Sequence, residues 1–351
     1  MYDSIIIGCG QAGLAIAYYL KKANQNFLLI DKRSEIGETW KERYDSLTLF
    51  TPRLYNSLPG LPFSGEKHGF PDKIEVADYL KKYAEMFEFP IHLKEEVIHV
   101  KKTNDSYLIM TRKGEYKAKH VIVATGPFQT PNIPSIANEL SNSIYQIHSS
   151  QYKNPSQLVN GGVLVVGGGN SGAQIAVELS KKKDTYLAVS RKLSSFPLII
   201  GKKSTFWWFK KLGILSTDSH SFLGKIIQKK GDFIFGSELK NAVRRNEVKV
   251  KKRVIAAKEN ELIFADDTTL QVNNIIWATG FKTELPWLKI DGVFDHNGNI
   301  RHDRGVANME GLYFIGLPWQ SRRGSALLQG VGYDAKYIAE IINGKFSRSA
   351  D

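Results

Sequence analysis

A glycine motif occurs twice in this chain in the same surroundings, and the repeat constrains the fold more than any other sequence feature. Residues 4–33 and 163–192 each form the pattern of an apolar strand, a Gly-x-Gly-x-x-Gly turn, a helix and a second strand. The copies keep one register, 159 residues apart, at the six positions Gly8, Gly10, Gly13, Gly167, Gly169 and Gly172. One such turn is a weak signal, but two in this full context predict two nucleotide-binding α/β units.

Each residue of such a turn has a physical role. The first glycine permits the tight turn, the second lets the backbone approach a pyrophosphate, and the third allows the helix to pack closely on the strand. The helix N-terminus offers free N–H groups to the phosphates. We therefore predict contacts to a dinucleotide from Gln11 and Ala12 in the first copy and from Asn170 and Ser171 in the second, although Asn170 and Ser171 could equally be helix caps.

The two copies differ where the second strand ends. The first copy ends in Asp31-Lys32, and a carboxylate there accepts hydrogen bonds from ribose hydroxyls, which suits FAD or NAD. The second copy ends in Ser190-Arg191, where a hydroxyl and a guanidinium can bind a 2′-phosphate that a carboxylate would repel. The second unit is therefore predicted to prefer NADPH over NADH. The alternative is that Arg191 is a solvated surface residue.

A second landmark is also repeated. The stretches VIVATG (121–126) and IIWATG (275–280) follow their third glycines by 113 and 108 residues. We predict that these turns line the cofactor sites, at Thr125, Gly126, Thr279 and Gly280. The resulting fold class is α/β with two Rossmann-like dinucleotide-binding domains. The NADPH-binding domain (156–274, with a helical insertion at 193–240) is inserted into the FAD-binding domain (1–155 and 275–351).

Composition narrows the class of protein. The chain has 351 residues, a formal net charge of +13 and 42% hydrophobic residues, as expected for a globular protein. Cys9 is the only cysteine, so a disulfide, a CxxC pair and a cysteine-built metal site are excluded, and we predict no metal. Met1 leads directly into a strand pattern, and no apolar run reaches the ~18 residues of a spanning helix. We expect a soluble cytoplasmic protein.

Together these motifs resemble the flavin-containing monooxygenases, most closely the short bacterial members. The resemblance covers nearly the whole chain and includes GCGQAG, ERYDSLTLFTP, ATGPFQTPNIP, HSSQYK, GGGNSG, ATGF and GLPWQSRRGSALLQGVG. It implies FAD and NADPH as cofactors, hydride transfer from NADPH to FAD, and activation of O2 as a C4a-(hydro)peroxyflavin. One oxygen atom then passes to a small soft nucleophile or a ketone.

The resemblance also suggests site residues. The family signature is present at His148, Tyr152 and Lys153, which implies a role in the linker between the domains. Trp40 belongs to a segment expected to cover the flavin, and Val97 is expected to contact the adenine through its backbone. The candidate catalytic residues are Thr51, Asn170 and Gln320, with Gln320 also expected to bind cofactor. Each of these could instead stabilise a loop.

Other functions remain open. Asn142 and Ile144 replace a Phe and a Gly of the signature, so a flavin reductase or diaphorase that passes electrons to a quinone or protein is one alternative. The aromatic and basic segment 201–235 suggests a membrane-associated, non-enzymatic flavoprotein as another. That segment could equally cover the substrate entrance or form a subunit interface. No nucleic-acid recognition motif accompanies the charge, so we predict no nucleic-acid partner, and a homodimer is the default.

Overall fold

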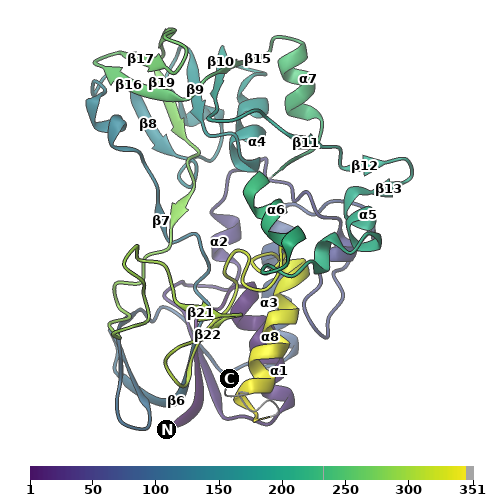
Figure 1. The fold of residues 1–351 in the computed structure, drawn as a ribbon, viewed down its shortest axis with the longest axis vertical. Helices are drawn as coiled ribbons and strands as arrows, with labels where there is room; N and C mark the ends of the chain where they lie inside the picture. Colours follow the sequence, from purple (N-terminus) through teal and green to yellow (C-terminus); the bar gives the residue numbers. More distant parts are fainter. Residues whose placement is uncertain (232, 345–351) are drawn as a thin grey trace.

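Two sheets with parallel central strands, one in each half of the molecule, form the framework of the fold (Figure 1). The computed structural model describes residues 1–231 and 233–344. The parallel strands of the first sheet lie in the order β3-β2-β1-β6-β23, and those of the second in the order β15-β10-β9-β19-β8. The predicted α/β class, with two Rossmann-like units and one inserted into the other, is confirmed.

The first unit is built from both ends of the chain. Its N-terminal part contains β1 (Tyr2–Ile7), α1 (Gln11–Lys22), β2 (Phe27–Ile30), α2 (Glu38–Lys41), α3 (Lys73–Met86), β3 (Ile91–His92), β4 (Val97–Lys102), β5 (Tyr107–Thr111) and β6 (Glu115–Val123). Its C-terminal part contains β21 (His302–Asp303), β22 (Val306–Ala307), β23 (Leu312–Phe314) and α8 (Leu328–Ile342). Because β23 pairs in parallel with β6, the chain returns to the first sheet after completing the second unit.

The second unit repeats this design. It contains β8 (Tyr145–His148), β9 (Val163–Val166), α4 (Asn170–Leu179), β10 (Thr185–Ala188), α7 (Glu238–Arg244), β15 (Val248–Lys251), β16 (Val254–Lys258), β17 (Glu261–Phe264), β18 (Thr269–Gln271) and β19 (Asn274–Trp277). The strands β1, β2, β3 and β6 correspond in order to β9, β10, β15 and β19. The fifth strand follows the other four along the chain in the first unit and precedes them in the second.

The boundaries expected for the second unit need correction. We expected 156–274, but β8 and all of β19 belong to the second sheet, because β19 pairs in parallel with both β8 and β9. Apolar patterns reveal that these segments are strands but not which sheet they join. The assignment of the two units to FAD and NADPH stays a prediction.

The segment expected to be a helical insertion is mixed in structure. It contains β11 (Ser195–Phe196), β12 (Ile199–Ile200), β13 (Lys203–Ser204), α5 (Thr205–Lys211), α6 (Phe222–Lys230) and β14 (Ile234–Phe235). Two short strands that link the units, β7 (Thr130–Pro131) and β20 (Phe281–Lys282), pair with each other in antiparallel fashion. Among the described residues, no helix is long and apolar enough to cross a membrane.

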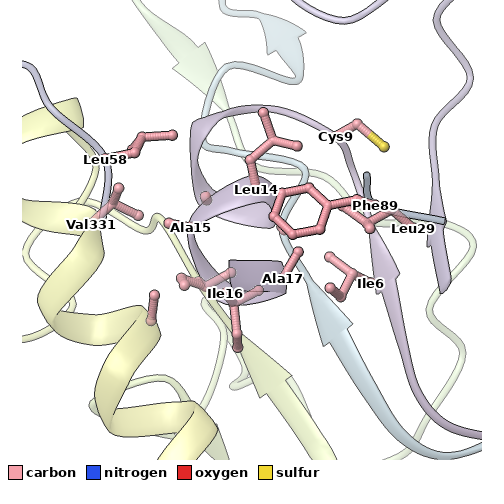
Figure 2. Packing of buried hydrophobic residues seen from close by; sticks show 14 of the residues in the cluster. Ile6, Cys9, Leu14, Ala15, Ile16, Ala17, Leu29, Leu58, Phe89 and Val331 are labelled. Atoms are coloured by element: carbon pink, nitrogen blue, oxygen red, sulfur yellow. The ribbon is translucent and has the colours of Figure 1, made fainter. Parts of the chain in front are cut away.

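Helix α1 is buried between the first sheet and α8. Figure 2 shows Ala15 and Ile16 of α1 between the strand residues Ile6 and Leu29 and Val331 of α8. All five residues are completely buried and belong to one apolar cluster. Burial of this kind is the main favourable contribution to folding, and it fixes where the N-terminus of α1 lies.

The third glycine of each turn lets the helix approach the turn closely. A Cβ on Gly13 would lie 1.9 Å from the carbonyl oxygen of Gly8, and a Cβ on Gly172 would lie 2.0 Å from that of Gly167. No side chain fits at such a distance. The position of each helix relative to its sheet therefore requires glycine.

We expect Gly13→Ala to lower the free energy of unfolding by about 3 kcal/mol, the upper end of the cost of overpacking, because backbone must move to admit the methyl group. Gly10→Ala is the matched control, since nothing lies within 4 Å of a Cβ there, and its effect should stay within about 0.5 kcal/mol. Thermal unfolding followed by circular dichroism measures both. Equal melting temperatures for the two variants would contradict this explanation.

Candidate functional site

The two glycine turns have the same geometry. Gly8 has φ +109° and Gly167 has φ +124°, a backbone conformation that favours glycine. A Cβ on Gly8 would lie 2.6 Å from the carbonyl oxygen of Ala124, and one on Gly167 would lie 2.2 Å from that of Ala278. These alanines begin the repeated Ala-Thr-Gly stretches. The Ala-Thr-Gly stretch therefore occurs in both units because its alanine packs against the first glycine of the turn.

The second glycine of each turn faces open space. Gly10 precedes α1 and Gly169 precedes α4 as the N-cap residue, with no side-chain hydrogen bond at either cap. Nothing lies within 4 Å of the position that a Cβ would take at either residue. The first N–H groups of each helix have no partner within the helix. Each turn can therefore receive an anionic group against bare backbone, as a pyrophosphate requires.

Asp31 lies beside the first turn. Its Oδ2 accepts a hydrogen bond from the Cys9 N–H at 2.6 Å, and its Oδ1 accepts one from the Arg33 N–H at 2.9 Å. Burial, with a smaller contribution from the charge of Asp31, raises the pKa of the Cys9 thiol well above its usual range. Cys9 is therefore a small buried residue and a poor nucleophile. The carboxylate of Asp31 is held at the edge of the open turn, where a ribose would lie.

A surface hollow lined by charged side chains lies close to Asp31. Its volume is about 430 Å³, and it is lined by Lys32, Arg33, Glu38, Lys94, Glu96 and Arg112. Arg33 pairs with Glu38 at 3.2 Å, and Arg112 pairs with Glu96 at 2.6 Å. The hollow is therefore a mixed-charge surface beside the first turn, with the exposed Lys32 nearest to Asp31 in the chain.

The corresponding place in the second unit carries no carboxylate. Ser190 and Arg191 follow β10, and both are exposed. The guanidinium of Arg191 lies against Gly231, where a Cβ would be 2.0 Å from Nη1. Ser171, in the first turn of α4, is also exposed. The first unit therefore has a carboxylate after its second strand, whereas the second unit has an exposed serine and arginine there, as the sequence indicates.

Asn170 has a structural role that the sequence did not reveal. Its Nδ2 donates to the carbonyl oxygen of Phe233, and its Oδ1 accepts from the N–H of Phe235, both at 2.9 Å. These bonds tie the insertion to the start of α4. Because the amide group is used in this way, the structure does not support a catalytic role for Asn170.

Gln320 is also engaged with the backbone, and it is only 1% exposed. Its Nε2 donates to the carbonyl oxygens of Phe314 at 3.0 Å and Arg304 at 3.3 Å, while its Oε1 accepts from the Leu317 N–H at 3.2 Å. This side chain holds the turn after β23 in place. The side chain of Gln320 thus has a structural role, and its expected catalytic or cofactor-binding role stays a prediction.

Thr51 is buried beside an asparagine that the sequence analysis missed. Its hydroxyl donates to Asn56 Oδ1 at 2.6 Å, and Asn56 Nδ2 donates to the Thr51 carbonyl oxygen at 2.7 Å. Both residues are at most 4% exposed. The reciprocal bonds close the loop on itself, so this hydroxyl is not presented to a substrate. No local signal in the sequence marks this pair.

The other predicted cofactor contacts lie around the first turn with varied exposure. Gln11 Nε2 donates to the carbonyl oxygen of Ala326, which joins α1 to the loop before α8. Ala12 is buried and Trp40 is half-buried against the same apolar cluster. Val97 begins β4 and is 8% exposed. In the first Ala-Thr-Gly stretch, the carbonyl oxygens of Thr125 and Gly126 accept hydrogen bonds from Gln129 Nε2.

The second Ala-Thr-Gly stretch supports the linker between the units. Thr279 Oγ1 donates to the carbonyl oxygen of Asn132, and the Asn132 N–H donates to the Gly280 carbonyl oxygen at 2.9 Å. Phe281 packs edge-on against the ring of His148, with 4.9 Å between the ring centroids. The stretch thus joins the two crossing segments of the chain.

His148 is completely buried in this linker, and its hydrogen bonds define a neutral ring. The Ser150 N–H donates to Nδ1 at 3.2 Å, so Nε2 carries the proton and donates to the Gly280 carbonyl oxygen at 3.0 Å. Burial lowers the pKa of His148, and the charge of Arg43 lowers it further. The linker role implied by the resemblance fits this geometry, because His148 binds backbone of the opposite crossing segment.

Further contacts join the units across their interface. Tyr44 OH donates to Gln174 Oε1 at 2.7 Å, and Gln174 Nε2 donates to the carbonyl oxygen of Thr48 at 3.1 Å. Lys153 reaches back to the carbonyl oxygen of Glu42. Within the second unit, Tyr152 is fully buried and donates to Glu178 Oε2 at 2.8 Å. None of these pairs is close in sequence, so no local pattern could reveal them.

Comparisons with known proteins agree with this arrangement. A family model described as pyridine nucleotide-disulphide oxidoreductase matches residues 5–197. An uncharacterized oxidoreductase of Bacillus subtilis, CzcO, is 62% identical over 345 residues, which are 98% of this chain and all of that protein. A probable indole-3-pyruvate monooxygenase of Arabidopsis thaliana, YUCCA4, is 28% identical over 98% of this chain and 90% of its own length. A flavin-containing monooxygenase from Stenotrophomonas maltophilia has the same fold, with a TM-score of 0.84 and 24% identity over 98% of both chains.

The free energy of unfolding should decrease as the pH is lowered from 7.5 to 5.5. As the pH falls through about 6.5, the unfolded chain protonates His148 while the folded chain, with its lowered pKa, does not, so protons favour unfolding. In His148→Gln, we expect the loss of unfolding free energy between these two pH values to be smaller by about 1 kcal/mol. Part of it stays, because burial also lowers the pKa of His120 and His302.

Denaturant unfolding at the two pH values measures this change. His68→Gln, at an exposed position, is the matched control and should keep the pH dependence of the parent protein. The argument fails if the two variants show the same pH dependence.

Proposed function

This chain belongs to the pyridine nucleotide-disulphide oxidoreductase family, and we propose that it is an FAD- and NADPH-dependent enzyme that transfers one oxygen atom from O2 to a small soft nucleophile or a ketone. The observation that carries the proposal is the pair of open glycine turns with equal geometry and different chemistry at the ends of β2 and β10. One unit presents a carboxylate beside its turn and the other a serine and an arginine.

The family and the enzyme class are established by the comparisons. The chain is an oxidoreductase, and its resemblance to the flavin-containing monooxygenases is confirmed. The single cysteine excludes a dithiol mechanism within one chain, whatever the wider family does. We also propose a cytoplasmic location, which the lone thiol suits.

The first unit has the features that FAD binding needs. The bare backbone at Gly10 and the first turn of α1 would hold the pyrophosphate. Asp31 would accept hydrogen bonds from the adenosine ribose, and the backbone N–H of Cys9 keeps its carboxylate in place. Bound there, FAD would supply hydride acceptance and oxygen activation, which no side chain can provide.

The second unit has the features that NADPH binding needs. Gly169 and the start of α4 would hold its pyrophosphate, as in the first unit. Ser190 and Arg191 would bind the 2′-phosphate, because a hydroxyl donor and a guanidinium match its negative charge. The contacts of Tyr44 with Gln174 and of His148 with Gly280 would hold this unit in a fixed position relative to the first.

An aromatic cluster between the units would exclude water from the reaction. Phe50 stacks on Phe235 with ring centroids 4.7 Å apart, and Phe206 packs on both. Phe50 comes from the first unit, and Phe206 and Phe235 come from the insertion. Exclusion of water matters because water promotes loss of activated oxygen as hydrogen peroxide. The balanced reaction consumes NADPH, a proton, O2 and the substrate, and yields NADP+, water and the oxygenated product.

A reductase that passes electrons from NADPH to a quinone or protein acceptor is the second candidate. It is favoured by one observation: the polar side chains of Thr51, Asn170 and Gln320 are all bound to other groups of the protein. None of them is free to donate a proton to a reacting oxygen. Hydride transfer alone would not need such a donor.

The test is the fate of oxygen in the FAD-loaded protein. With NADPH, air and a panel of a dialkyl sulfide, a tertiary amine and a ketone, we expect at least one compound to yield an oxygenated product as NADPH is consumed. The control is Gly10→Ala, which should fold but lose FAD and this activity, since its methyl group fills the open side of the turn.

The competing outcome is also defined. Release of one hydrogen peroxide per NADPH with every compound, together with acceleration by a quinone, would reject oxygen transfer and support the reductase.

Cofactor preference tests the role of the second unit. We expect Arg191→Ala to lower kcat/KM for NADPH about tenfold or more, the usual loss for a charge-assisted hydrogen bond, while kcat/KM for NADH stays nearly constant. Arg244→Ala, which removes another exposed arginine of the same unit, is the matched control. Steady-state kinetics with both coenzymes measure the effect. An equal loss for NADH and NADPH would remove Arg191 from the binding of the 2′-phosphate.

A further inference from the structure

The insertion exposes an unusual amount of apolar surface. We call the exposed apolar residues of this segment its outer face: Ile199, Ile200, Trp208, Leu212, Phe222, Leu223 and Ile226. They are seven of the eighteen large hydrophobic residues that are exposed in the described chain, and they fall within 28 residues. Such a concentration marks an interaction surface rather than the scattered exposure of ordinary proteins.

Helix α6 presents the most exposed part of this face. Phe222 is 83% exposed and Leu223 is 50% exposed, with Ile226 one turn further on. Lys225 and Lys229 flank them and are exposed as well. With Gln228, the side chains of Phe222, Ile226 and the two lysines line a surface hollow of about 370 Å³.

The opposite side of α6 is fixed to the protein. Gly224 is buried, and a Cβ there would lie 2.1 Å from the carbonyl oxygen of Asp218. Gln228 Nε2 donates to the Ser219 carbonyl oxygen at 2.8 Å, and the Ser219 N–H donates to the Ser321 carbonyl oxygen at 2.8 Å. The apolar side chains are therefore held outward by a folded helix.

Helix α5 has the same two-sided character. Phe206 and Phe209 are buried in the aromatic cluster at 3% and 7% exposure, whereas Trp208 and Leu212 face outward at 38% and 66%. The outward residues again lie beside lysines, Lys210 and Lys211 in the same helix. The insertion therefore has an apolar side that packs on the enzyme and a second apolar side that the described residues leave exposed.

The insertion carries an excess of positive charge. Between residues 193 and 240 there are eight lysines and three acidic residues, Asp218, Asp232 and Glu238. Exposed aromatic and aliphatic side chains bordered by lysines are typical of helices that lie in the interface of an anionic bilayer. A second copy of the chain fits less well, because a symmetric contact would place the same lysines opposite each other.

We propose that the outer face of the insertion docks on an anionic membrane surface. Phe222, Leu223 and Ile226 enter the region between headgroups and acyl chains, and Lys225 and Lys229 lie among the lipid phosphates. The attachment is peripheral, since no described helix can cross a bilayer. It is separate from the proposed reaction, because none of these residues belongs to the nucleotide sites.

The test is co-sedimentation of the full chain with vesicles. We expect binding to vesicles of phosphatidylcholine with phosphatidylglycerol, weak binding to pure phosphatidylcholine, and loss of binding at high salt. Phe222→Ser combined with Leu223→Ser should weaken binding about tenfold or more. Lys225→Glu combined with Lys229→Glu should weaken it about twentyfold or more.

Matched controls separate this surface from general charge and hydrophobicity. Ile98→Ser removes an exposed apolar residue of the first unit, and Lys101→Glu with Lys117→Glu reverses two exposed lysines there. Both controls should bind as the parent protein does, and all variants should keep its rate of NADPH oxidation without lipid.

Several results would overturn the proposal. These are no binding to anionic vesicles, equal weakening by the control variants, or insensitivity to the substitutions in α6. A dimer in sedimentation velocity that Phe222→Ser and Leu223→Ser dissociate would identify the outer face as a contact between copies of this chain instead.

Discussion

The close approach of each helix to its own glycine turn is the contact on which the rest of this structure depends. In both units the third glycine lies against the carbonyl oxygen of the first, at positions where a Cβ would be about 2 Å away. The first glycine of each turn lies against the carbonyl oxygen of the alanine that directly follows β6 or β19. These contacts bring strand, turn, helix and neighbouring strand together with no side chain between them. Only backbone then faces the open side of the turn, and backbone N–H groups can bind an anion there.

The two units share this packing of strand, glycine turn and helix, but the contacts that join the units are not symmetric. Strands β7 and β20 pair between the sheets, and the neutral His148 donates to Gly280 beside that pair. Tyr44 and Gln174 connect the first unit to α4. A reaction between two bound nucleotides needs their reactive ends at a defined distance, and these contacts determine how far one unit can move relative to the other. The linker is therefore part of the functional arrangement although it contributes no reactive group.

The insertion gives the second unit two further properties. Its inner aromatic residues close the space between the units through the stacking of Phe50 on Phe235, and Asn170 ties that region to the start of α4. Its outer residues are exposed beside lysines, and the segment has eight lysines against three acidic residues. One short segment thus faces both the proposed reaction site and the surroundings of the protein.

The sequence by itself determined the α/β class, the two open glycine turns and the contrast between Asp31 and Ser190-Arg191. It could do so because glycine positions and strand ends are local features with strict steric and electrostatic requirements. The tertiary structure alone decided that β8 and β19 join the second sheet, and that Gln320, Asn170 and Thr51 hold backbone groups and a buried asparagine. The partners of these side chains, such as Phe314, Phe233 and Asn56, are chosen by folding. A polar residue in a loop has the same appearance in a sequence whether it binds a ligand or its own backbone, because only burial and geometry separate the two.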